Sequence, residues 1–165
     1  MNQTILMPVV QAALDKNEIQ HKVLDCLPEY ADTAAFCEHY NLTLSQAANT
    51  ILITSRKVEP VKYALCVVLG DSRLDVNKKV CELLGVKRAS FADGETTKDL
   101  TGMMIGGVTI FGVDGLPIYV DSQVLQQNEV VMGGGNRSSK VLLDPKQLTK
   151  IQNLQIVDGL AKKIE

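Results

Sequence analysis

The chain has 165 residues, which suits one domain of ordinary size and is short for two. Apolar residues make up 45% and charged residues 22% of it, a balance that excludes disorder as the main state. The 17 Lys and Arg against 19 Asp and Glu give a net charge of −2. This excludes binding of DNA or RNA through bulk positive charge, but it allows a local basic patch.

The first two thirds of the chain predict helices and strands in alternation. The clearest helix follows Asp75, because Val76, Val80 and the Leu83-Leu84 pair recur at helical spacing before Gly85 stops the helix. Periodicity and turn residues predict, in chain order, helix 5–16, strand 20–24, helix 32–39, strands 50–53 and 61–69, helix 76–84, strand 87–91 and helix 95–100.

The last third is rich in short strands. β-branched runs between turn residues predict strands 108–113, 116–120, 130–132 and 141–143. Asp144 and Pro145 are typical of a helix start, and they predict a helical tail over residues 144–165. We therefore expect a single α+β domain over residues 1–165, with a mixed, mainly antiparallel sheet that can curl into a barrel.

The four cysteines form no metal-binding or redox motif. Cys26, Cys37, Cys66 and Cys81 include no C-x-x-C pair, and neither histidine stands at zinc-ligand spacing from them. We expect buried free thiols, no metal site and no cofactor. Residues 5–14 lack the basic segment of a signal peptide, and the longest apolar run is far below membrane-spanning length, so we expect a soluble cytoplasmic protein without membrane contact.

Two glycine clusters and one aspartate are candidate binding features. Glycines at 102, 106 and 107 and at 133–135 can bring backbone N–H groups close to an oxyanion, although their spacing alone favours tight turns between strands. Asp121 directly follows a predicted strand, where its carboxylate either orients a site or caps the turn with Ser122.

Several segments in fixed order resemble one known family. They are Ala48-Asn49-Thr50-Ile51-Leu52-Ile53, Leu69-Gly70-Asp71-Ser72-Arg73-Leu74-Asp75, Thr101-Gly102 running into Gly106-Gly107-Val108-Thr109-Ile110-Phe111-Gly112, Tyr119-Val120-Asp121, Val131-Met132-Gly133-Gly134-Gly135, and Leu142-Leu143-Asp144-Pro145-Lys146-Gln147-Leu148. Over residues 20–150 the chain resembles the YbaK/prolyl-tRNA-synthetase-associated editing domains. The resemblance implies a distorted barrel flanked by helices, and a pocket for the aminoacyl 3′ end of tRNA.

The resemblance also implies site residues, with two departures from the family pattern. Asn49 stands where active members carry lysine, and Ile110 stands where their Gly-x-x-x-Pro loop has proline. An asparagine amide can donate a hydrogen bond but lacks the charge. The implied catalytic residues are Asn49, Gly106 and Gly107. The implied substrate-binding residues are Thr50, Ile110, Asp121, Gly133, Gly134, Gly135, Arg137 and Lys140.

Two functions follow as alternatives. The first is a free-standing aminoacyl-tRNA deacylase with an altered site, acting on the 3′ end of mischarged tRNA and helped by an aminoacyl-tRNA synthetase. The second is an inactive relative that binds tRNA, an amino-acid-like ligand or another protein. A cation that replaces the missing lysine would favour the first, and Lys57, Lys62, Arg137 and Lys140 are the candidates.

Overall fold

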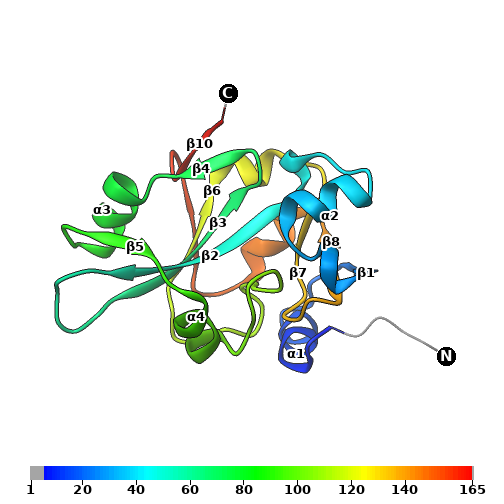
Figure 1. Cartoon of the computed structure of the whole chain (residues 1–165), viewed down its shortest axis with the longest axis horizontal. Helices are drawn as coiled ribbons and strands as arrows, with labels where there is room; N and C mark the ends of the chain where they lie inside the picture. Colours follow the sequence, from blue (N-terminus) through cyan, green and yellow to red (C-terminus); the bar gives the residue numbers. More distant parts are fainter. Residues whose placement is uncertain (1–5, 165) are drawn as a thin grey trace.

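A computed structural model describes residues 6–164 (Figure 1). Its largest sheet has five strands, which lie in the order β5 (Ala89–Phe91), β2 (Ala48–Ser55), β3 (Tyr63–Leu69), β6 (Ile118–Asp121) and β9 (Leu154–Val157). The centre of this sheet is the apolar run of β3, in which every residue after Tyr63 is buried. β2 and β3 pair antiparallel from Ala48 opposite Leu69 to Thr54 opposite Tyr63, whereas β3, β6 and β9 run parallel.

Two smaller sheets complete the architecture. In the first, β8 (Ser139–Leu143) lies between β1 (Lys22–Asp25) and β7 (Val130–Gly133), and both pairings are antiparallel. The second pairs β4 (Ser72–Leu74) with β10 (Ala161–Lys163). A single parallel bridge from Ala47 to Val131 links the three-stranded sheet to the start of β2. The predicted α+β class with mixed sheets is confirmed, but the strands form three sheets that do not close into a barrel.

The helices are short and lie around the sheets. Asp75 accepts a hydrogen bond from the Lys78 backbone N–H at the start of the predicted 76–84 helix, and Gly85 ends that helix with φ +70°. The helical elements are α1 (Pro8–Lys16), η1 (Pro28–Tyr30), α2 (Thr33–His39), η2 (Leu44–Gln46), η3 (Val76–Val80), α3 (Cys81–Leu84), α4 (Gly94–Thr101), η4 (Ser122–Gln126) and η5 (Pro145–Lys150).

Three predicted elements need correction or comment. The predicted strand 108–113 is wrong. Residues 108–113 are irregular: their backbone joins no sheet, and their apolar character reflects packing into the core. The predicted helical tail 144–165 is wrong: the η5 turn leads into β9 and β10. The N-terminal helix begins at Pro8, and position 5 of its predicted range lies outside the described residues.

The core occupies both faces of the five-stranded sheet. On one face Leu65, Val67 and Val120 pack in a cluster that includes Met132 and Val141 of the three-stranded sheet and Val10 and Leu14 of α1. On the other face, a second cluster contains Ile53, Cys66, Val80 and Leu84. All four cysteines are buried and free. None of the helices described in residues 6–164 is long and apolar enough to cross a membrane.

Candidate functional site

A pocket of about 420 Å³ opens beside the N-terminal half of β2. β5 pairs with β2 at Ile53–Ser55, so the preceding residues 49–52 have an open edge, and this edge forms the pocket floor. The other walls are α2 with the two residues before it, the loop after α4 and the ends of β7 and β8. Of the predicted site residues, the lining contains Asn49, Thr50, Gly106, Gly133 and Lys140.

Lys140 brings a buried cation into this pocket. The residue is 7% exposed, and its Nζ donates to the carbonyl oxygens of Ala31 at 2.6 Å and Gly106 at 2.8 Å. It also lies 5.5 Å from the centre of the Phe36 ring. Burial lowers the pKa of the Lys140 ammonium below that of an exposed lysine. Since an ammonium has three N–H donors and two are used here, one is left for a ligand.

Asn49 and Thr50 add polar groups on the floor. The Thr33 hydroxyl of α2 donates to Asn49 Oδ1 at 2.5 Å, while the Asn49 amide N–H₂ donates to no other described residue. Thr50 Oγ1 is buried and has no hydrogen-bond partner among the described residues. A buried hydroxyl without a partner costs about 1–3 kcal/mol. Because Thr50 Oγ1 lies beneath the pocket surface, the accessible unsatisfied donor on the floor is the Asn49 amide.

Arg137 lies behind the pocket wall. Its guanidinium donates to the backbone oxygens of Ile105 at 2.7 Å and Pro28 at 2.8 Å, and it pairs with Asp32 at 3.2 Å. It therefore ties η1 and the start of α2 to the loop after α4. Lys140 connects the same two segments nearer the pocket, because its Nζ donates to the carbonyl oxygens of Ala31 and Gly106.

The two glycine clusters pack against each other. The Gly107 N–H donates to Met104 O at 2.9 Å, and the Gly135 N–H donates to Gly107 O at 2.7 Å. A Cβ on Gly107 would meet the Asn136 backbone, so close approach requires glycine here. Gly107, Gly134 and Gly135 lie outside the pocket lining, whereas the Gly106 N–H in the lining donates to no described residue.

The remaining predicted residues lie elsewhere. Ile110 is buried in the core beside a second, smaller hollow of about 280 Å³ near α1. Asp121 is fully buried at the end of β6, where the N–H groups of the following turn and of Leu160 and Ala161 face it without a hydrogen bond of ordinary geometry. Burial raises the pKa of its carboxyl, and those N–H groups offset part of the rise. Lys57 and Lys62 lie at the tip of the β2–β3 hairpin, outside the pocket lining.

Sequence reasoning missed the pocket residues from α2, β5 and the segment before α2. Thr33 and Phe36 come from α2, and the exposed side chains of Phe91 and Ile105 stand at the rim, with exposed fractions of 59% and 55%. The sequence gives no signal for these residues, because the exposure that marks Phe91 and Ile105 is a property of the fold. No three His, Cys, Asp or Glu side chains among residues 6–164 gather in a way that would hold a metal ion.

Comparison with known proteins gives consistent matches. The family described as aminoacyl-tRNA editing domain matches residues 28–151. The uncharacterized protein YwhH of Bacillus subtilis (strain 168) is 31% identical over 122 residues, which cover 68% of this chain and 76% of YwhH.

Two solved structures resemble the whole fold. One is described as a candidate trans-editing enzyme for prolyl-tRNA synthetase; it has a TM-score of 0.79 and 27% identity, covering 96% of this chain and 99% of that one. The hypothetical protein APE2540 has a TM-score of 0.82 at 20% identity, covering 93% and 99%, and it shows the fold alone.

Proposed function

Because the chain belongs to the family of aminoacyl-tRNA editing domains, we propose that its pocket hydrolyses the ester between an amino acid and the 3′ end of tRNA. The observation that supports this most is Lys140, a buried cation in a pocket whose floor carries Asn49 in place of lysine. The charge that the family resemblance expects from β2 is supplied here from β8. The substrate would be mischarged tRNA released by a synthetase.

The reaction requires stabilisation of one developing negative charge. Water attacks the ester carbonyl carbon, a C–O bond forms, and the carbonyl oxygen becomes an oxyanion. The third N–H of Lys140 and the Gly106 N–H are the donors proposed for this oxygen, while the Asn49 amide holds the amino acid. The oxyanion then collapses and the bond to the ribose oxygen breaks. The proton that the attacking water gives up ends on that ribose oxygen, and the free amino acid leaves.

The pocket favours stabilisation of the oxyanion over catalysis by a side-chain base. Asp32 is the one carboxylate among its described lining residues, and it is paired with Arg137 at its exposed edge. An ester is activated enough for water to attack once the oxyanion is stabilised in a dry site. Lys140 and the backbone donor are therefore expected to carry most of the rate enhancement.

The test is deacylation of a panel of mischarged tRNAs by the purified protein. We expect release above the spontaneous rate for at least one amino acid, and a loss of about 100-fold in kcat/KM in Lys140→Met. Lys140→Arg should retain part of the activity, because it keeps the charge. Lys146→Met, at an exposed position, is the matched control.

Two results would contradict the proposal. Release at the spontaneous rate from every tRNA would leave the alternative of a binding module. Full activity in Lys140→Met, with the thermal midpoint shown to be intact, would remove Lys140 from the mechanism.

A further inference from the structure

One end of the molecule concentrates positive charge although the whole chain carries −2. The β2–β3 hairpin loop (56–62) and the turn before β5 (85–88) meet there, and together they contain five basic residues and one acidic residue, Glu59. We call this group the basic end. All five of its side chains are exposed: Arg56, Lys57, Lys62, Lys87 and Arg88.

Backbone pairing forces these cations together. The Arg56 N–H donates to Arg88 O at 2.9 Å, and the Ser55 N–H donates to Lys62 O at 2.8 Å, so three adjacent strands each present a basic residue. Like charges on neighbouring strands repel one another. None of the five forms an ion pair with another residue in the described part of the chain. This arrangement suits an external anion.

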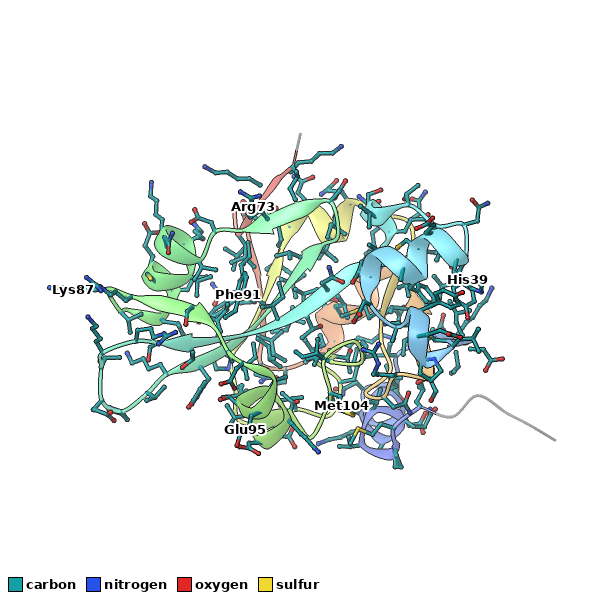
Figure 2. The ribbon with its side chains drawn as sticks, in the orientation of Figure 1. His39, Arg73, Lys87, Phe91, Glu95 and Met104 are labelled. Carbon is teal, nitrogen blue, oxygen red and sulfur yellow. The ribbon has the colours of Figure 1, made fainter. Side chains whose placement is uncertain are left out.

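The basic end is connected to the pocket by β5. Phe91, at the other end of this three-residue strand, lines the pocket rim with 59% of its surface exposed. At about 3.3 Å per residue, Arg88 lies about 10 Å along the chain from Phe91. Figure 2 shows Lys87 at the far end of the molecule and Phe91 nearer its middle. An exposed aromatic followed by a row of cations is the pattern that binds single-stranded nucleic acid.

We propose that this edge binds the acceptor end of tRNA, with Phe91 stacking on the terminal base and the basic end holding phosphates farther along. The inference rests on the proposed function, because an amino acid inside the pocket leaves its nucleoside at the rim. Phe91 and Ile105 are the exposed apolar residues that line this rim. The phosphates that follow then run towards Arg88 and Arg56.

The experiment compares two substrates that share one ester. The first is a full aminoacyl-tRNA, and the second is the same amino acid on adenosine alone, which reaches the rim but not the basic end. We expect Arg56→Gln/Lys57→Gln/Lys87→Gln/Arg88→Gln to lower the ratio of kcat/KM for tRNA to that for the adenosine ester by about 10-fold. The log–log salt dependence of tRNA binding should flatten by about one unit for each phosphate that the variant protein no longer binds.

The matched control removes four exposed lysines elsewhere, at positions 16, 22, 146 and 162, and should leave the ratio unchanged. Phe91→Leu should weaken both substrates by about 10-fold, and Phe91→Tyr should restore them, because tyrosine keeps the stacking face. An unchanged ratio in the basic-end variant, or a decrease equal to that of the control, would overturn the proposal.

Measurement of tRNA binding separates the test of the basic end from the test of the proposed deacylase function. If the wild-type protein hydrolyses neither substrate, the deacylase assignment fails, whereas titration of tRNA against salt still measures the basic end. Equal tRNA affinity in the basic-end variant and the control would then reject the surface itself. Weaker binding in the basic-end variant would support it.

Discussion

At the scale of single residues, the distinctive feature is a buried lysine that donates to two backbone carbonyl groups. Lys140 is enclosed by Ala31, Phe36 and Gly106, and burial lowers its pKa from the usual 10.5. The folded state therefore binds this proton less tightly than the unfolded chain does. It follows that Lys140 lowers stability at neutral pH, and that this cost disappears as pH rises from the folded pKa to 10.5.

We predict that the free energy of unfolding of the wild-type protein rises, relative to Lys140→Met, as pH increases through that window. Methionine removes the titrating group, so the difference between the two proteins isolates it from the other lysines and tyrosines. Urea midpoints measured between pH 7 and about 10.5 check this. A difference that stays constant with pH would show that Lys140 titrates like an exposed lysine.

Sequence alone could not select this residue. Lys57, Lys62, Arg137 and Lys140 are all candidates for the replacing cation, and Arg137 and Lys140 are the two named as substrate-binding residues. The choice among them depends on which loop reaches β2 in space. The bridge between Ala47 and Val131, which are far apart in the chain, determines which loop lies beside β2. Asn49 and Thr50 were easier to place, because they lie on a strand whose pattern is local.

At the scale of elements, the loop after α4 takes its shape from glycine contacts. Gly107 packs against the backbone of the 133–136 turn, which also places Gly106 and the Lys140 contact at the pocket. The run from Val108 to Val113 was predicted as a strand because it is apolar. These residues are apolar because they are buried in the core. The sequence pattern alone does not distinguish a buried strand from an irregular buried segment.

We predict that Gly107→Ala destabilises the protein by about 1–3 kcal/mol, because its methyl group would overlap the Asn136 backbone. Gly94→Ala is the control: its Cβ would meet Ile105 at an ordinary 3.8 Å, and alanine favours the helix there. Thermal or urea unfolding measures both variants. Equal stability of the two would show that the loop moves aside at little cost.

The C-terminal segment illustrates a second limit at this scale. Asp144 and Pro145 did begin a helical turn, with Asp144 accepting from the Lys146 N–H, but the turn ends at Lys150. A signal for the strands that follow was present in the Asp158-Gly159 pair, where Gly159 adopts φ +73° between β9 and β10. In the sequence, the helix start at Asp144 and Pro145 is a stronger signal than the turn at Asp158 and Gly159.

At the scale of the whole molecule, the class of fold was predictable and its sheet arrangement was not. Periodicity placed β3, β7 and β8 close to their observed bounds, yet the order β5-β2-β3-β6-β9 depends on pairings between distant parts of the chain. β9 completes this order from a segment predicted to be helical. Thus a closed barrel could not be distinguished from three separate sheets.

The burial of the four cysteines predicts how their thiols react. Every cysteine is buried, and burial raises the pKa of the Cys66 thiol to about 12. We predict that a thiol-specific reagent at pH 8 modifies the folded protein slowly and all four cysteines rapidly after unfolding, since thiolate is the reactive form. Rapid reaction of one thiol in the folded state would reveal a local opening at that site.

The position of the pocket cation also bears on how such sites diverge. Residue 49 on β2 and residue 140 on β8 line the same cavity, although 91 positions separate them in the chain. Lysine at both positions would bring two ammonium groups into one cavity. Their mutual repulsion would lower the pKa of each, so a cation at one position makes a second cation at the other costly.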